Sequence, residues 1–388
     1  MKKIYLDNSA TTKIREEALD KYVRVSRECF GNPSSLHTEG FMAERELEAA
    51  RASILKTVGG DKCNVIFTSS GSEANNLAIV GRGLARERFR HGCRVITTMG
   101  EHASVSEPFA RLSELGLRTD YIPTRGGALD FDLLSRELSR DVVLVSVMMA
   151  NNETGAVYDL PRLSKLVRQM CPDALIHVDA TQGYMKIPFT LGAIGADMVT
   201  LSSHKIEGPK GVGALVVREE CIKTKALAPV ILGGGQEGGL RSGTENVPGI
   251  AAFGVAAELG FKTLREDVSK MESLRSYLIE RLGSAELSLI KPVLPPHHAP
   301  HILNLILPSI KSETMLHFLS SFGIFVSSGS ACSSNTGHHS DALTAYGYTP
   351  DEADSSIRVS FSKHNTKEDV DALCDALREG LSRLARKR

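Results

Sequence analysis

The sequence lacks the features that mark several large classes of protein. Its 46 lysines and arginines balance its 46 aspartates and glutamates, so the formal net charge is zero. No long basic block suggests a nucleic-acid surface, and no direct contact with nucleic acid is expected. Neither a signal-like segment nor an apolar run of about 18 residues is present, so no membrane contact and a cytoplasmic location are expected.

Paired cysteines are also missing. The seven cysteines are an odd number, widely spaced and without a CxxC pair, which argues against disulfides or structural zinc and favours a reducing compartment. Cys332 stands apart, because the small residues of "VSSGSACSS" (326–334) cannot bury it. The histidine-rich "LPPHHAPH" (294–301) is interpreted as a loop because of its prolines, and no metal site is expected.

Between about residues 60 and 220, short β-rich segments alternate with helical patterns. A chain of 388 residues with 42% hydrophobic residues is long enough for one large or two moderate domains. The alternation predicts an α/β fold, with a mostly parallel sheet covered by helices on both faces. The predicted strands are 64–68, 94–98, 142–149, 175–179, 197–202 and 213–217, and the predicted helices are 72–89 and 160–170.

The rest of the chain predicts a smaller α+β domain. A long helical segment over 246–283 leads away from the sheet. It is followed by a strand at 301–307, a helix at 313–322, a strand at 357–362 and a closing helix at 366–385. We therefore expect a large domain over 16–259 and a small domain built from 1–15 and 260–388.

Polar residues directly after the predicted strands are the candidate site, since ligands of open α/β sheets bind beyond the carboxyl ends of the strands. "SSGSEANN" (69–76) leads from a strand into a helix, where free backbone N–H groups and the helix dipole favour a phosphate. Gly71 allows close approach and Ser72 adds a hydroxyl. A serine N-cap without any ligand is the alternative interpretation.

The next two strand ends carry further polar groups. His102 lies at a strand-to-helix junction, and Asn151, Asn152 and Glu153 follow the third predicted strand. Taken singly, each has a plain structural interpretation: a structural histidine, and a loop closed by its own Asx turns.

The last two of these strand ends suggest a cofactor. Asp179 follows a buried strand and needs a cationic partner, which a protonated ring nitrogen would supply. Lys205, together with Ser202 and His204, lies between a strand and a glycine-rich turn, where desolvation would make its amine a nucleophile toward carbonyls. A lysine, a buried aspartate and a helix N-terminus together are what pyridoxal phosphate requires.

Ordered motifs along nearly the whole chain resemble one family. They are "YLDNSATT" (5–12), "FGNPSSLH" (30–37), "GSEANNLAI" (71–79), "EHASV" (101–105), "NNETG" (151–155), "HVDATQ" (177–182), "SSHKIEGPKGVGAL" (202–215), "GGGQEGGLRSGTENV" (233–247), "SSGSACSS" (327–334) and "SSIRVSFS" (355–362). The chain resembles the cysteine desulfurases, the NifS/IscS-like branch of the class V aminotransferases. The resemblance implies the fold of the fold-type I pyridoxal-phosphate transferases.

The resemblance also implies how the cofactor is bound. Lys205 would attach it covalently, Asp179 would pair with its ring nitrogen, and Gln182 would hydrogen-bond its ring hydroxyl. His102 would stack on the ring and move protons, with Asn152 also near the cofactor. The phosphate would be held by Gly71, Ser72, Ser202, His204 and, from the other subunit of a homodimer, Thr244.

The same resemblance implies a reaction. Arg358, assisted by Asn152, would clamp the carboxylate of free L-cysteine. Cys332 would attack the substrate sulfur, keep it as a persulfide and pass it to an acceptor protein, either an iron–sulfur scaffold or a thiolation carrier, while alanine is released. The small residues around Cys332 suit a mobile loop, and weak order is expected over about 333–341.

Some positions depart from the family pattern. Ser72 stands where threonine is common, Ser104 replaces a usual alanine, Ser203 a usual glycine and Gly238 a usual arginine. Glu207 occupies a position that is typically neutral and often aromatic. Its carboxylate could raise the pKa of Lys205 or simply point to solvent, and we expect it to point to solvent. These changes leave the cofactor lysine, the aspartate, the nucleophile and the carboxylate clamp in place, so activity is expected.

Three other functions are compatible with the same scaffold. A selenocysteine lyase shares the cofactor, but retention of Cys332 favours sulfur transfer. In an aminotransferase, Cys332 would have no catalytic role. A non-catalytic scaffold would be expected to lack Lys205 or Asp179, and both are present.

Overall fold

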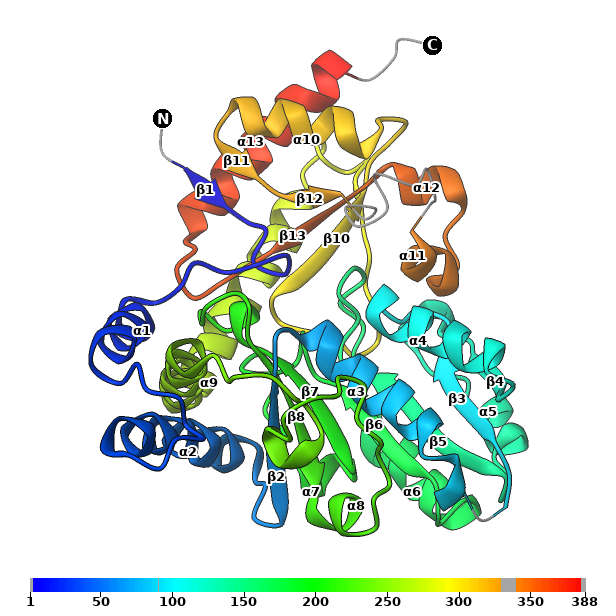
Figure 1. Cartoon of the computed structure of the whole chain (residues 1–388). Coiled ribbons are helices and arrows are strands. Elements are labelled where there is room, and N and C mark those ends of the chain that lie inside the picture. The colour runs from blue at the N-terminus through cyan, green and yellow to red at the C-terminus, as the bar shows by residue number, and fades with distance from the viewer. Residues whose placement is uncertain (1–2, 90, 329–339, 385–388) are drawn as a thin grey trace.

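The computed structural model describes residues 3–89, 91–328 and 340–384, and its centre is a seven-stranded sheet of order β2-β8-β7-β6-β5-β3-β4 (Figure 1). The strands are β2 (Cys63–Thr68), β3 (Arg94–Thr98), β4 (Arg118–Ile122), β5 (Val142–Met148), β6 (Leu175–Asp179), β7 (Met198–Ser202) and β8 (Gly213–Arg218). β8 is antiparallel to both of its neighbours, and the other adjacent pairs are parallel. The predicted mostly parallel sheet is therefore confirmed.

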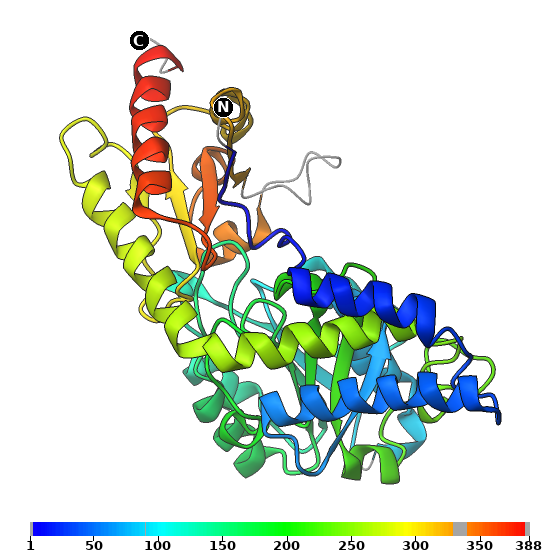
Figure 2. The ribbon, with the colours of Figure 1, turned by 90° about the vertical axis from the view of Figure 1, so that its left-hand side faces the viewer.

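Helices cover both faces of this sheet. Val65 and Phe67 of β2 belong to the hydrophobic cluster beneath α1 (Glu16–Glu28), α2 (Thr38–Val58) and α9 (Val247–Leu282). Ile66, which points the other way, belongs to the cluster beneath α3 (Gly71–Leu84) and α4 (Ala103–Glu114). Figure 2 shows α1, α2 and α9 side by side on one face. Shorter helices complete the layers: α5 (Phe131–Glu137), α6 (Leu160–Met170), α7 (Leu191–Ile194) and α8 (Glu219–Lys223).

The long helix α9 connects two hydrophobic cores. Ala251 and Ala257 lie in the core of the large sheet, whereas Met271 and Leu278 lie in the second core. Within the described ranges, α9 is the one helix long and apolar enough to cross a membrane, but 61% of its apolar window is buried inside the protein, as in a core helix.

The second core surrounds a four-stranded antiparallel sheet of order β12-β13-β10-β9. Its elements are β9 (Lys291–Pro292), β10 (Ile302–Ile306), α10 (Ser312–Ser321), β12 (Ser327–Ser328), α11 (Asp341–Tyr346), α12 (Pro350–Asp354), β13 (Ser356–Ser360) and α13 (Lys367–Leu384). The N-terminal β1 (Ile4–Tyr5) pairs in parallel with β11 (Ile324–Phe325), and Ile4 and Leu6 are buried in this core. The smaller α+β unit is thus present, while its proposed boundary at 259/260 stays a prediction because α9 crosses it unbroken.

The strands and helices that were predicted coincide with observed elements to within about two residues, except for one helix. The helix predicted over 72–89 ends at Leu84, and a short 3₁₀ turn, Arg86–Arg88, follows it. Other elements were not predicted, among them the helices α1, α2 and α4 and the strand β4.

Candidate active site

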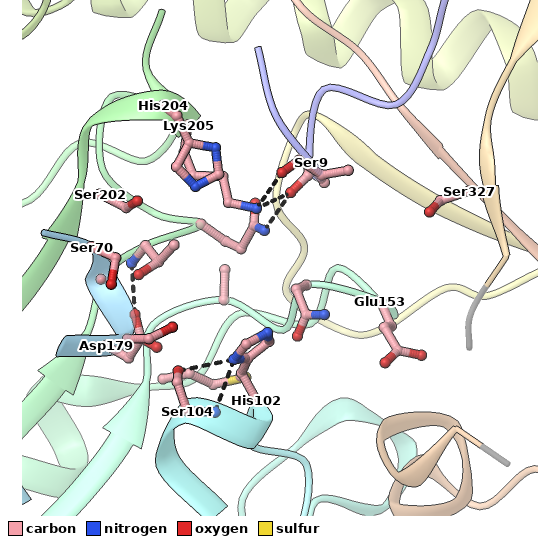
Figure 3. Close-up of a pocket in the computed structure, with 18 of the residues that line it drawn as sticks. Ser9, Ser70, His102, Ser104, Glu153, Asp179, Ser202, His204, Lys205 and Ser327 are labelled. Atoms are coloured by element: carbon pink, nitrogen blue, oxygen red, sulfur yellow. Dashed lines mark hydrogen bonds between the residues drawn. The ribbon is translucent and has the colours of Figure 1, made fainter. Parts of the chain in front are cut away.

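A cavity of about 310 Å³ lies at the carboxyl ends of the parallel strands, beside β12 and β13. All the predicted site residues line it except two. The lining set includes Gly71, Ser72, His102, Asn152, Asp179, Gln182, Ser202, His204, Lys205 and Arg358. Thr244 is exposed and does not line the cavity of this chain, and Cys332 lies outside the described residues. Figure 3 shows His102, Asp179, Ser202, His204 and Lys205 converging on the cavity from separate elements.

The start of α3 forms one wall of the cavity. Ser70 caps the helix, and its hydroxyl accepts a hydrogen bond from the Glu73 N–H at 3.2 Å. A Cβ atom at Gly71 would lie 3.2 Å from Thr181 Oγ1 and 3.3 Å from the Cβ of Ser202, so the backbone here approaches its neighbours closely. The free N–H groups of a helix start, facing hydroxyl groups, form a cup that fits a phosphate.

His204 lines the cavity next to this cup. Burial, together with the cationic neighbours Lys205 and Lys210, lowers the pKa of His204 to about 4. Its Nδ1 lies 3.1 Å from Thr11 Oγ1. The ring is therefore neutral at physiological pH and acts as a hydrogen-bonding group, not as a cation.

Asp179 ends β6 at the floor of the cavity and is 5% exposed. Its Oδ2 accepts a hydrogen bond from Asn75 Nδ2 at 2.8 Å, and its Oδ1 accepts one from the Thr181 N–H at 2.9 Å. These donors are neutral, and no lysine or arginine of the described ranges forms an ion pair with this carboxylate. A protonated ring nitrogen would supply the positive charge that a buried carboxylate needs.

His102 caps α4 through its own ring. The Nδ1 atom accepts a hydrogen bond from the Ser104 N–H at 3.1 Å and lies 2.9 Å from Ser104 Oγ. A backbone N–H can only donate, so Nδ1 carries no proton and the neutral ring has its hydrogen on Nε2. Burial lowers the pKa of His102, which favours this neutral form.

Ser104 also connects the histidine to the floor of the cavity. Asn75 Nδ2 donates to Ser104 Oγ at 2.9 Å and to Asp179 Oδ2 at 2.8 Å. The serine at this position therefore completes a hydrogen-bonded chain from Asp179 to His102.

Lys205 directs its amine into the cavity. Its Nζ donates hydrogen bonds to the backbone carbonyls of Ser9 at 2.5 Å and Ala10 at 2.9 Å (Figure 3). Gln182 Nε2 donates to the same Ser9 carbonyl at 3.0 Å, and Gln182 Oε1 lies 3.4 Å from His301 Nε2. The two carbonyls were missed as site groups, although the motif that contains them was recognised.

Arg358 on β13 also lines the cavity and is 6% exposed. Its Nη2 lies 2.9 Å from Asp7 Oδ1, and its Nη1 donates to the backbone carbonyl of Asn152 at 2.9 Å. The Nε atom is buried and has no hydrogen-bond partner among the described residues. Asp7 therefore orients the predicted carboxylate clamp, and it too was missed.

Glu153 is a further acid of the cavity lining. Its Oε2 accepts a hydrogen bond from Ser340 Oγ at 2.5 Å, and burial raises the pKa of Glu153 to about 7.

The prediction that Glu207 points to solvent is wrong. Its side chain is buried, with the residue 7% exposed, and it forms ion pairs with Arg15 and Lys363. The partners come from distant parts of the chain, so the local sequence gave no sign of them.

Two other departures from the family pattern lie at Gly238 and Ser203. Gly238 has a φ of 65°, a conformation that glycine adopts more readily than arginine. Ser203 is fully buried, and nothing in the structure explains its hydroxyl.

No metal-binding cluster of three or more His, Cys, Asp or Glu side chains occurs among residues 3–89, 91–328 and 340–384. Within the histidine-rich stretch, His298 Nε2 lies 3.0 Å from both carboxylate oxygens of Glu272.

A mostly parallel sheet with a lysine, a buried aspartate and a helix N-terminus around one cavity at its carboxyl edge defines a pyridoxal-phosphate enzyme of fold type I. The model of the family "Aminotransferase class-V" matches residues 4–373, and the chain belongs to this family.

Two relatives and two solved structures show how far the similarity extends. The chain is 38% identical to "Cysteine desulfurase IscS 1" of Archaeoglobus fulgidus, over 98% of this chain and 97% of that protein. It is 36% identical to "Cysteine desulfurase IscS" of Dictyoglomus turgidum, over 99% and 95%. A solved "NIFS-LIKE PROTEIN" superposes with a TM-score of 0.89 at 34% identity, over 98% of this chain and 100% of that one. "SspA in complex with cysteine" superposes with a TM-score of 0.79 at 27% identity, over 94% and 100%.

Proposed function

We propose that this protein is a pyridoxal-phosphate-dependent cysteine desulfurase that converts L-cysteine to L-alanine and passes the sulfur to an acceptor. The observation that carries the proposal is that Lys205, Asp179 and Arg358, from three separate elements, line one cavity. The names of the relatives and the bound cysteine of the SspA structure support it.

The residues present fit pyridoxal phosphate. The cup at Gly71, which a single added Cβ would crowd, would hold the phosphate, together with Ser72, Ser202 and His204. Asp179, which has no lysine or arginine partner in the described part of the chain, would hold the ring nitrogen. When bound, the cofactor supplies an electron-accepting ring that makes the Cα–H of the amino acid acidic.

The chain's own residues bind the substrate and move its protons. Arg358, already oriented by Asp7, binds the carboxylate of L-cysteine. The amine of Lys205 takes the proton from Cα. His102 presents its Nε2–H to the cavity, because its Nδ1 is occupied by Ser104.

Sulfur transfer is assigned to Cys332. Its thiolate forms a bond to the substrate sulfur, the carbon–sulfur bond breaks with its electron pair remaining on carbon, and a proton then completes alanine. The product on the protein is a persulfide. A homodimer in which Thr244 reaches the partner's cup, a cytoplasmic location, and an iron–sulfur scaffold or thiolation carrier as acceptor belong to the same proposal.

The test uses purified protein with added pyridoxal phosphate. We expect a visible absorption band and, with L-cysteine and a thiol reductant, equal yields of sulfide and alanine. Cys332→Ala should lose turnover and keep the band, whereas Cys93→Ala, at an exposed cysteine, should retain turnover. Turnover of selenocysteine alone by Cys332→Ala would indicate a selenocysteine lyase. Absence of the band would contradict the proposal and favour a non-catalytic scaffold.

A further inference from the structure

The carboxylate of Glu207 connects three chain segments that meet at the active-site cavity. They are the N-terminal segment with Arg15, the turn that carries Lys205 and Glu207 itself, and the segment after β13 with Lys363 and His364. Its Oε2 accepts hydrogen bonds from Arg15 Nη2 at 2.7 Å and Arg15 Nε at 3.2 Å, and lies 2.9 Å from Lys363 Nζ. Its Oε1 lies 2.8 Å from His364 Nε2. Glu207 itself follows Lys205 by two residues.

The first of these segments is the N-terminal strand and its loop. Thr12 Oγ1 donates to the His204 carbonyl and accepts from the Glu207 N–H, both at 2.8 Å. The Arg15 N–H donates to the Glu207 carbonyl at 3.0 Å. Upstream in the same segment, the carbonyls of Ser9 and Ala10 hold the Lys205 amine, so this segment and the lysine turn position each other.

The segment that follows β13 is the third. Lys363 and His364 come five and six residues after Arg358, which lines the active-site cavity together with Lys205. The Ser9 N–H also donates to Ser360 Oγ at 2.9 Å. The Glu207 carboxylate therefore links the turn of the lysine to the strand of the carboxylate clamp.

The charges around Glu207 show why a carboxylate belongs here. Burial alone would raise the pKa of Glu207, but hydrogen bonds and charges from Lys363 and Arg15 outweigh it and lower the pKa to about 2. Lys186 adds a further cation beside it, and Asp267 of α9, 3.9 Å from the Lys363 Nζ, is the other anion. Without Glu207, these cations would face one another around a small pocket in which Asp267 is the one remaining acid among the described lining residues.

The backbone of Glu207 gives an independent sign of a fixed position. Its φ is 66°, in the left-handed region that glutamate seldom adopts. Such a conformation persists only where the surroundings determine it, and such sites cluster near functional centres.

We propose that Glu207 is a positioning residue that fixes the Lys205 turn against the N-terminal segment and β13. In doing so it keeps the amine of Lys205, its two carbonyl acceptors and Arg358 in register. The consequence for catalysis rests on the proposed function, whereas the positioning itself does not.

The test compares Glu207→Gln with Glu237→Gln. Glu237 is a matched control because it is buried, has a positive φ of 48° and pairs with Arg51, but does not line the cavity. Without cofactor, Glu207→Gln should raise the amide exchange of residues 5–12 at least tenfold, and Glu237→Gln should leave it unchanged. Equal exchange of residues 5–12 in Glu207→Gln and the wild type would overturn the proposal.

A second readout uses protein loaded with pyridoxal phosphate. The pH midpoint of the visible band should move to lower pH in Glu207→Gln by at least half a unit, because loss of the carboxylate two residues from Lys205 leaves the Arg15 and Lys363 cations unbalanced and so disfavours the protonated form of the Lys205 nitrogen. An unchanged midpoint would also contradict the proposal. If the wild type forms no visible band, the proposed function fails, and the exchange experiment still tests the positioning.

Lys363→Met is a second variant that tests the same proposal if Glu207→Gln does not fold. It removes the ion pair between Lys363 and Glu207, which is one of the two contacts toward β13, and leaves the Arg15 and His364 contacts in place. Exchange of residues 5–12 and 356–365 should rise at least threefold, and no rise in either segment would contradict the proposal.

Discussion

Ser104 directs two hydrogen-bond donors at one atom of His102. Its N–H lies 3.1 Å and its Oγ 2.9 Å from His102 Nδ1. The oxygen of Ser104 also accepts from Asn75, so its own proton is free to point at the imidazole. This arrangement fixes the neutral tautomer with the hydrogen on Nε2, the atom that a substrate in the cavity can reach.

Ser104→Ala should therefore raise the pKa of His102. The hydroxyl bonds to the neutral form of the ring, and a neutral hydrogen bond of about 1 kcal/mol corresponds to somewhat less than about one pKa unit. An NMR titration of the His102 ring measures this shift, with His204 as an internal control. An unchanged His102 pKa would show that the hydroxyl does not hold the tautomer.

Arg358→Lys should weaken substrate binding while keeping the charge. A lysine cannot contact both Asp7 and the Asn152 carbonyl while presenting a planar fork to a carboxylate. We expect KM for L-cysteine to rise by about tenfold, which corresponds to ~1.4 kcal/mol. Spectral titration with L-alanine measures the same loss without turnover. An unaltered affinity for both amino acids would exclude Arg358 as the clamp.

Gly71→Ala should weaken cofactor binding without unfolding the protein. The added Cβ would lie 3.2 Å from Thr181 Oγ1 and 3.3 Å from the Cβ of Ser202, and so crowd the cup. We expect the affinity of the unloaded protein for pyridoxal phosphate to fall at least tenfold, with an unchanged Tm. Gly192→Ala is the control, because nothing lies within 4 Å of its added Cβ. Equal cofactor affinities in the two variants would place the phosphate elsewhere.

Six of the seven strands of the sheet could be predicted from the sequence because they are largely buried on both faces and therefore appear as continuous apolar runs, whereas the partly exposed edge strand β4 was missed. The helices α1 and α2 gave weaker signals. In α1, Leu19 and Val23 are exposed while Ala18 is buried, so the apolar pattern does not mark the buried face. The buried face of α2 includes small residues such as Ala43 and Ala50.

In the candidate site, too, only part of the arrangement could be predicted from local sequence patterns. The lining residues at the carboxyl ends of strands could be predicted, because parallel strands bring those ends to one edge. The hydrogen-bond and ion-pair partners of the site residues and of Glu207 could not be predicted. Ser9 meets Lys205 across 196 positions of sequence, and Arg15 meets Glu207 across 192. Such contacts depend on how the N-terminal segment packs, which no local pattern records.

Glu101, next to His102, allows a test of how the burial of a carboxyl group makes the stability of the protein depend on pH. Its Oε1 accepts hydrogen bonds from Thr98 Oγ1 at 2.6 Å and the Met148 N–H at 2.9 Å, while its Oε2 is buried and finds no partner in the part of the chain that the structure describes. Burial raises the pKa of Glu101 to about 8. The folded protein therefore holds a proton here at neutral pH, which the unfolded chain releases near its ordinary value of about 4.5.

This difference predicts the sign of a stability change. The stability that the protonated Glu101 contributes is fully present below about pH 4.5 and is lost as the pH rises through about 8. Glu101→Gln keeps an oxygen for the two donors and has no proton to lose. We therefore compare the free energy of unfolding in urea of Glu101→Gln with that of the wild type. The difference, variant minus wild type, should be more positive at pH 8.5 than at pH 5, by a few kcal/mol. The exposed Glu258→Gln is the control, and a Glu101→Gln difference that is the same at both pH values would show that Glu101 is ionised in the folded protein.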